Sequence, residues 1–170
     1  MKMEVSNNRR EYSKQLGDKA EIKFIELMKD YLKKNNYPIN IKKSNDYQDR
    51  KLHIDYYINN KGFDVKAKRH LETIWLEKKN VNGFDGWLLG KADYIVFDIL
   101  ELNSFCIFKR QDLYNHIKDI NEYTTNKYKH NKIYTRSKWG KKDELIKVTY
   151  NKIKHLEVFK ISYNKQTKLF

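Results

Sequence analysis

The hydrophobic period of this chain changes near its single proline, and the change limits the folds that it can adopt. Over residues 12–32 the apolar residues repeat with the spacing of an amphipathic helix. The next three apolar runs, 52–58, 63–69 and 72–77, instead alternate apolar and polar residues, as half-buried strands do. This order predicts one helix followed by a meander of three short strands.

The sequence patterns after residue 77 predict a loop, four further strands and one helix. Residues 78–91 carry three of the six glycines and are expected to form a loop with at most one helical turn. Residues 92–100 indicate a strand buried on both faces, with 104–108 as its hairpin partner. The remaining patterns favour a helix at 109–120 and strands at 144–150 and 156–163.

With 170 residues, no repeats and no linker, the chain is expected to form one domain, with a core at about 12–120 and a basic C-terminal extension at 121–170. The lone Cys106 allows no disulfide within the chain and no cysteine zinc site, which is typical of a reducing compartment. The sequence also lacks an apolar signal region and a stretch long enough to span a membrane. A cytoplasmic protein with no membrane partner is therefore expected.

The chain is strongly basic, with 36 Lys and Arg residues against 22 Asp and Glu residues and a formal charge of +14. Such a charge attracts polyanions, so DNA is the first partner to consider. A lysine-rich composition can also reflect an AT-rich coding sequence, which leaves charge alone as a weak argument.

The segment "HIDYYINNKGFDVKAKR" (53–69) places two carboxylates and an ammonium on one predicted hairpin. A turn at Asn59-Asn60 puts Asp55 opposite Asp64, whereas a turn one residue later puts Asp55 opposite Lys66. In both registers the three charged residues share a face. The other face is expected to point into the core with Ile54, Tyr56, Ile58, Phe63, Val65 and Ala67.

Two neighbouring carboxylates repel each other unless a cation lies between them, and hard oxygen ligands suit Mg²⁺ or Mn²⁺. A lysine two residues after the second carboxylate projects over the same place, where it can orient a water or stabilise charge on a phosphate. The residue types therefore indicate metal-assisted phosphodiester hydrolysis.

Asp55 followed by Asp64-Val65-Lys66 resembles the signature of the PD-(D/E)XK, or restriction-endonuclease-like, nucleases: an acidic residue, a turn, then (D/E)-x-K. The resemblance covers roughly residues 12–98. It implies an α/β fold with an N-terminal helix, a three-stranded meander and a mixed sheet flanked by helices. The chain departs from the pattern at Ile54, where the family has proline, and at Asp64, where glutamate is commoner.

The resemblance also implies the site. Asp55 and Asp64 would ligate Mg²⁺, or Mn²⁺ in its place, together with the backbone carbonyl of Val65. Lys66 would position the attacking water, and Glu21, in the segment "GDKAEIKF", would be a further metal ligand. The catalytic set is thus Asp55, Asp64, Lys66 and Glu21, and the products would carry a 5′-phosphate and a 3′-hydroxyl.

Ordinary structural explanations exist for each of these residues. The hairpin charges can form a solvated strand face with a cross-strand ion pair, and Glu21 can be a solvated helix residue. Glu77 is expected to share the active face, with a rim ion pair favoured over a metal contact. His53 and His70 are expected to be passive.

Cations and aromatic rings alternate over residues 123–142, as on surfaces that bind nucleic acid, although a solvated loop has the same composition. The glycines around Trp87 lack the spacing of a nucleotide-binding motif, so no nucleotide cofactor is expected. The residues predicted to contact nucleic acid are Lys68, Arg69, Lys129, Lys132, Arg136, Lys138, Trp139 and Lys141.

Together these features predict a magnesium-dependent endodeoxyribonuclease similar to small recombination and repair nucleases, such as Holliday-junction resolvases, including those that phages encode. Two symmetric cuts would require a homodimer. Two alternatives stay open: a sequence-specific restriction endonuclease, and a DNA-binding protein that keeps the fold but does not cleave.

Overall fold

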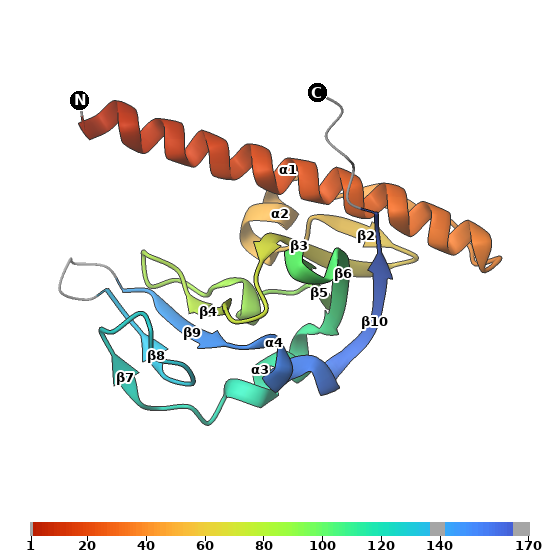
Figure 1. The fold of residues 1–170 in the computed structure, drawn as a ribbon. Helices are drawn as coiled ribbons and strands as arrows, with labels where there is room; N and C mark the ends of the chain where they lie inside the picture. Colours follow the sequence, from red (N-terminus) through yellow and green to blue (C-terminus); the bar gives the residue numbers. More distant parts are fainter. Residues whose placement is uncertain (1, 137–141, 165–170) are drawn as a thin grey trace.

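The structure is a computed structural model that describes residues 2–136 and 142–164, and it contains two mixed β-sheets and one long helix (Figure 1). The first sheet has six strands, in the spatial order β1 (Ile41–Lys43), β2 (Tyr56–Ile58), β3 (Lys61–Arg69), β5 (Tyr94–Ile99), β6 (Ser104–Lys109) and β10 (Glu157–Ser162). The second sheet has four, in the order β4 (Ile74–Lys79), β9 (Glu144–Val148), β8 (Ile133–Tyr134) and β7 (Tyr123–Thr124).

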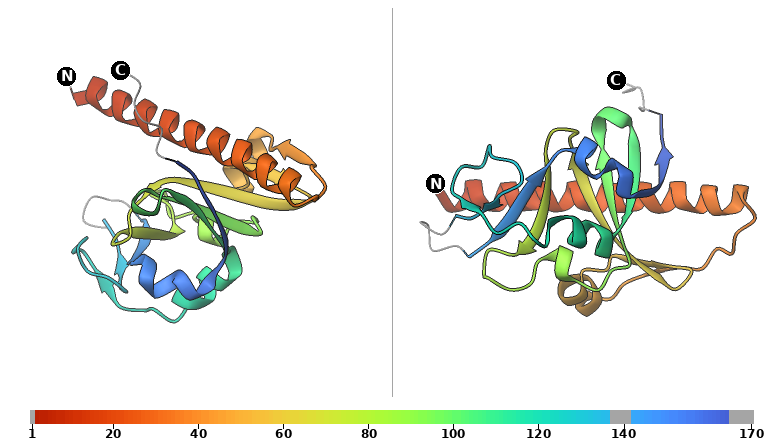
Figure 2. Two further views of the ribbon diagram at one scale, coloured as in Figure 1. Left: turned by 45° about the vertical axis from the view of Figure 1, so that its right-hand side comes forward. Right: turned by 90° about the horizontal axis from the view of Figure 1, so that it is seen from below.

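Helix α1 (Lys2–Lys34) covers one face of the six-stranded sheet, and its N-terminal end extends beyond the sheet (Figures 1 and 2). Ala20, Phe24 and Met28 follow one another at four-residue intervals and are all buried, as expected for the apolar stripe of a helix. They pack in one cluster with residues of the sheet, including Phe63 and Val96. The predicted N-terminal helix is confirmed and is longer than its apolar stripe.

A second core lies on the opposite face of the six-stranded sheet, toward the four-stranded sheet (Figure 2). Strand β5 contributes to both cores by alternation, because Ile95, Phe97 and Ile99 point into the second core and Val96 points toward α1. Cys106 is buried in this second core as well. The shorter elements that close it are η1 (Trp87–Leu89), α3 (Arg110–Ile117) and α4 (Tyr150–Ile153).

The β2–β3 hairpin turns at Asn59-Asn60, where both residues have positive φ, 48° and 65°. A two-residue turn of this kind matches the twist of the paired strands, and asparagine tolerates it better than most side chains. The pairing Tyr56↔Phe63 and Ile58↔Lys61 follows from that turn. The first of the two predicted registers is therefore the observed one.

The predicted meander is wrong at its first strand. Residues 52–55 do not continue β2, because α2 (Asp46–Leu52) occupies the preceding segment, and a capping box between Asn45 and Gln48 stabilises its N-terminus. His53 then leaves the helix with φ 54°. Ile54 packs on Gly62 and is buried in the core between the sheets, so its predicted core position is confirmed, but it does not share a face with Tyr56 and Phe63, which face α1.

The meander is wrong at its third strand too. Strand β4 pairs with β9 in the second sheet, and the sheet neighbour of β3 on that side is β5, which runs parallel to it. The pairing of β3 with β5 shifts between Lys66 and Arg69, and Lys68 has φ 46° there. This bulge ends the regular ladder of β3, and β4 buries Ile74 and Leu76 in the core between the sheets.

The remaining secondary-structure predictions are confirmed. The loop before β5 contains a single turn, η1, and β6 forms a hairpin with β5. Helix α3 and strands β9 and β10 lie at the predicted places. The chain also has two further short turns, η2 (Leu100–Leu102) and η4 (Lys154–Leu156). In the described part of the chain, no helix has the length and apolar character needed to cross a membrane.

Candidate active site

The hairpin brings Asp55, Asp64 and Lys66 together, as the sequence predicts. Asp55 stands directly before β2 and bonds to β3 on both sides of Asp64: its N–H donates to the Phe63 carbonyl at 2.8 Å, and its Oδ2 accepts from the Val65 N–H at 2.6 Å. The Lys66 Nζ lies 2.6 Å from Asp64 Oδ1. The three charged groups therefore form one cluster at the start of the hairpin.

This cluster is not a solvated strand face. Asp64 is only 1% exposed, and the Lys66 side chain is 19% exposed. The ion pair also joins two residues of the same strand, so it does not tie β2 to β3. Burial of a carboxylate is unfavourable unless its oxygens are paired.

One oxygen of Asp64 has no partner among the described residues. Oδ1 is paired with Lys66, whereas the buried Oδ2 forms no hydrogen bond to any residue that the structure describes. An unpaired buried carboxylate oxygen is costly in free energy, and such groups in native proteins are associated with function or with a bound ion. Asp64 Oδ2 is thus available as a ligand for a cation.

The raised pKa values of two carboxyl groups indicate that the negative charge at this cluster is not fully compensated by nearby cations. Burial, and next to it the charge of Asp64, raise the pKa of the Asp55 carboxyl to about 8, although Lys66 and the Val65 N–H oppose the rise. Burial also raises the pKa of Glu77. The charge of Lys66 lowers this pKa and the charge of Asp64 raises it. A divalent cation would favour the charged form of these carboxylates.

Glu21 is close enough for its charge to act on Asp55, but it is not gathered with the two aspartates. Its Oε2 lies 3.9 Å from the Nζ of Lys43 in β1, and burial raises the pKa of its carboxyl. Within residues 2–136 and 142–164, no group of three His, Cys, Asp or Glu side chains is arranged to hold a metal ion. The donor set in this structure is the Asp55–Asp64 pair.

The structure places Trp87, which the sequence reading did not include, and Glu77 beside the cluster. Among the described residues, the ion pair expected for Glu77 is not formed. The Lys66 Nζ lies 5.4 Å from the centre of the Trp87 ring, which is buried below it. A Cβ on Gly86 would lie 2.6 Å from the carbonyl oxygen of Glu77, so glycine is needed for this loop to approach β4. The glycines on either side of Trp87 were the available signal, and they reflect close packing beside the site.

The predicted nucleic-acid contacts have different surroundings. Lys68 and Lys129 are exposed. Arg69 is half-buried, and its Nη1 donates to the Ala67 carbonyl at 2.8 Å. Lys132 and Arg136 are in ion pairs with Glu122 and Asp143. Lys138, Trp139 and Lys141 lie outside the described residues.

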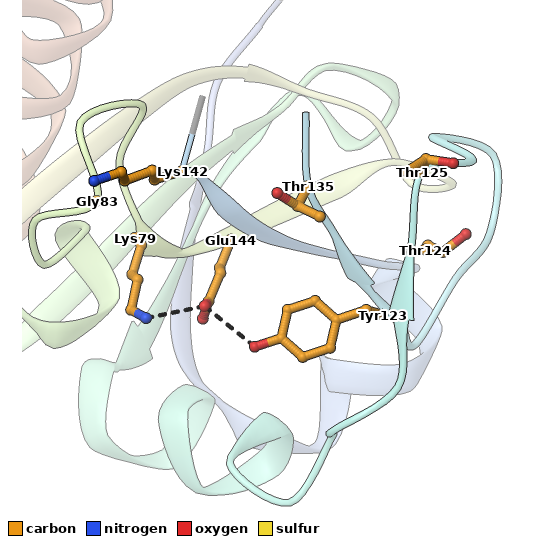
Figure 3. A pocket seen from close by; sticks show the side chains of 8 residues that line it. All are labelled: Lys79, Gly83, Tyr123, Thr124, Thr125, Thr135, Lys142 and Glu144. Atoms are coloured by element: carbon orange, nitrogen blue, oxygen red, sulfur yellow. Dashed lines mark hydrogen bonds and ion pairs between the residues drawn. The ribbon is translucent and has the colours of Figure 1, made fainter. Parts of the chain in front are cut away.

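A cavity of about 840 Å³ lies on the four-stranded sheet, away from the aspartates (Figure 3). Glu144 projects into it and accepts from Lys79 Nζ at 3.0 Å and from the Tyr123 hydroxyl at 3.2 Å. No residue of the Asp55, Asp64 and Lys66 cluster lines this cavity. The cavity is therefore separate from the hairpin cluster.

Comparison with known proteins adds no relative. No protein-family model matches the chain, and neither the curated proteins nor the solved structures contain a match. The fold is α/β with mixed sheets, and any conclusion on activity depends on the residues of the site.

Proposed function

We propose that this chain is a magnesium-dependent endodeoxyribonuclease with a restriction-endonuclease-like core. The observation that carries the proposal is Asp64, which is 1% exposed, paired with Lys66 through one oxygen and unpaired at the other. A second carboxylate, Asp55, lies beside it with its pKa raised to about 8 by burial and by Asp64. A structural ion pair needs neither the second carboxylate nor the unpaired oxygen.

The residues present fit a small divalent cation. Asp64 Oδ2 and the Asp55 carboxylate are hard oxygen donors, and few protein ligands are typical of Mg²⁺, which retains part of its water shell. Mn²⁺ accepts the same ligands. By the resemblance, the Val65 carbonyl completes the set and Glu21 acts from α1. When bound, the metal supplies Lewis-acid activation of the phosphate and lowers the pKa of a ligated water.

Lys66 holds a fixed place in this proposal. Its ammonium is anchored by Asp64 Oδ1 at 2.6 Å and lies over the Trp87 ring at 5.4 Å, so it has little freedom to turn away. An ammonium held in a poorly solvated site can orient a water for attack and stabilise the charge that develops on a phosphate. Trp87 limits the access of bulk water from below.

The formal charge of +14 supports DNA as the substrate. We further propose branched recombination or repair DNA, cut by a homodimer, because a symmetric dimer places two cuts symmetrically. The alternative within enzymes is a restriction endonuclease that cuts linear duplex at defined sequences. The alternative outside enzymes is a protein that binds DNA without cutting it.

The test incubates purified protein with a labelled four-way junction, a flap and a linear duplex, in Mg²⁺ or in EDTA. Asp64→Asn is the test variant, and Asp119→Asn, at an exposed position after α3, is a control with the same change of charge. We expect cleavage that needs Mg²⁺, persists in Asp119→Asn and is lost in Asp64→Asn. Cleavage of linear duplex alone, at one sequence, would replace the resolvase by the restriction enzyme.

Binding without cleavage under every metal condition would contradict the nuclease proposal. The acidic pair would then have a structural role only, and the chain would be a DNA-binding protein.

A further inference from the structure

A groove of about 350 Å³ lies between α1 and the C-terminal half of β3, directly beside the acidic pair. Its helix side is formed by Ser13, Leu16 and Gly17, and its strand side by Lys66, Lys68 and Arg69, with the intervening residues of β3. Among the described residues that line it, none is acidic. The groove is therefore a cationic space that adjoins an acidic one.

Lys66 connects the two spaces. Lys66 is one of the residues that line the groove, and its Nζ lies 2.6 Å from Asp64 Oδ1. On the helix, Ser13, Gly17 and Glu21 follow at four-residue intervals, so they share one face and are separated by rises of about 6 Å. This face of α1 therefore lines the cationic groove at Ser13 and Gly17. One turn further along it carries Glu21, whose charge acts on Asp55 and Asp64.

Gly17 keeps the groove open. A Cβ at this position would have no atom within 4 Å, and glycine is about 1 kcal/mol less favourable than alanine inside a helix. Neither packing nor backbone conformation of α1 therefore requires glycine here. A side chain at position 17 would instead project toward the space that the groove occupies.

The strand side supplies cations through the bulge of β3. The slip in pairing after Lys66 and the φ of 46° at Lys68 set Lys68 and Arg69 at the end of the regular ladder. The Arg69 Nε is buried and has no hydrogen-bond partner among the described residues. Arg69 adds a positive charge to the lining of the groove, and a guanidinium suits the paired oxygens of a phosphodiester.

We infer that this groove, defined by Ser13, Gly17, Lys66, Lys68 and Arg69 and here called the phosphate groove, binds the DNA backbone phosphate next to the one that is cut. The inference rests on the proposed function, since it places the scissile phosphate at Asp55 and Asp64. It places the bound DNA strand along α1 and gives Gly17 and Arg69 roles in substrate binding.

The test measures DNA affinity without cleavage, in EDTA and in Ca²⁺, as a function of salt concentration. Gly17→Glu fills the groove and adds a negative charge, Gly17→Gln fills it without charge, and Gly17→Ala leaves it nearly open. Gln15→Glu, at an exposed position on α1 two residues away, adds the same charge elsewhere. Helix content and thermal stability of all four variants are checked by circular dichroism.

We expect Gly17→Glu to weaken binding at least tenfold and to reduce the slope of log K against log salt by about 1, as for one lost phosphate contact. Gly17→Gln should weaken binding less, Gly17→Ala should weaken it least of the three, and Gln15→Glu, outside the groove, should bind like the wild type. Equal effects of Gly17→Glu and Gln15→Glu would overturn the inference, because a general charge effect would explain both.

A second arm locates the phosphate. Single methylphosphonates, which remove the charge of one phosphate, are placed along the labelled strand on either side of the mapped cut. One position next to the cut should weaken wild-type binding, and the same position should have little further effect in Gly17→Glu. Equal losses at every position would contradict the inference. If the wild type binds but never cuts, the nuclease proposal fails, while the salt slopes still decide whether the groove holds a phosphate.

Discussion

Asp64 and Asp143 are equally buried, each 1% exposed, and they differ in how their oxygens are satisfied. Asp143 receives three donors from one arginine: its Oδ1 accepts from the Arg136 N–H, and its Oδ2 accepts from Nε at 2.7 Å and pairs with Nη2 at 2.6 Å. Asp64 has Lys66 on one oxygen and no described partner on the other. A fully paired carboxylate stabilises its region, whereas a half-paired one leaves room for a ligand from outside the chain.

The largest expected effect concerns this difference directly. Asp64→Asn should reduce the single-turnover cleavage rate by about 10³-fold or more, because a group acting directly in the transition state is lost. Its melting temperature in EDTA should stay near that of the wild type. Asp143→Asn should do the opposite, with a loss of stability of about 1–3 kcal/mol and a nearly normal rate for the folded enzyme. Similar stability losses in both variants would make Asp64 another structural carboxylate.

Lys66 should show a smaller catalytic effect. Lys66→Gln removes the charge and keeps a polar side chain that is one atom shorter, and we expect the cleavage rate to fall by about 10²-fold. DNA affinity in EDTA should change by less than about threefold, since one of many cations is removed. An affinity loss as large as the rate loss would show that Lys66 serves binding rather than the chemical step.

The pH dependence of metal binding sharpens the comparison further. The pKa of Asp55 is raised to about 8 in the folded chain by burial and by Asp64, and it is near 4 in the unfolded chain. The folded state therefore binds more protons between these values, so metal-free stability should fall as the pH rises from about 4 to 8.

A cation that needs the ionised carboxylate should reverse this trend. Melting curves at pH 6 and pH 9 should show a larger stabilisation by Mg²⁺ or Mn²⁺ at pH 9, by a few °C. In Asp55→Asn both the metal-free decline and the metal effect should be reduced. Equal metal stabilisation at the two pH values in the wild type would contradict a site built on Asp55.

The smallest effects concern two glycines that flank the site. Gly17→Ala should stabilise the protein by up to about 1 kcal/mol, because the added methyl group meets nothing within 4 Å. Gly86→Ala should destabilise it by about 1–3 kcal/mol, because its Cβ would lie 2.6 Å from the Glu77 carbonyl oxygen. Thermal melts of both variants measure the difference. Destabilisation by Gly17→Ala would mean that position 17 is packed after all.

Much of the fold was predictable because its determinants are local. The helical period of α1, the alternation in β5 and the positive φ of Asn59 and Asn60 depend on residues within a few positions of each other. The first part of 52–58 was mispredicted as strand. Its apolar and polar residues alternate, which does not distinguish a strand from a loop, and the capping box between Asn45 and Gln48 instead favours the helix that ends there.

The candidate site was predictable to the same extent. Asp55, Asp64 and Lys66 meet because one tight turn joins their strands. Glu77 and Trp87 reach the cluster through β4 and a glycine-bearing loop, and neither sequence distance nor period reports such contacts. Glu21 was placed on the correct helix, but its ion pair with Lys43 of β1 depends on how α1 lies across the sheet.

By itself, the sequence determined that Asp55, Asp64 and Lys66 share a hairpin face and that positive charge is in excess, since these follow from local backbone preferences and composition. It left two registers of the hairpin open, and the structure has the turn at Asn59-Asn60. Only the tertiary structure decided that β4 joins the second sheet, that Asp64 is buried with one oxygen unpaired, and that a cationic groove opens beside it. The physical reason is that burial and pairing are set by contacts between segments distant along the chain, whose free energies no local pattern encodes.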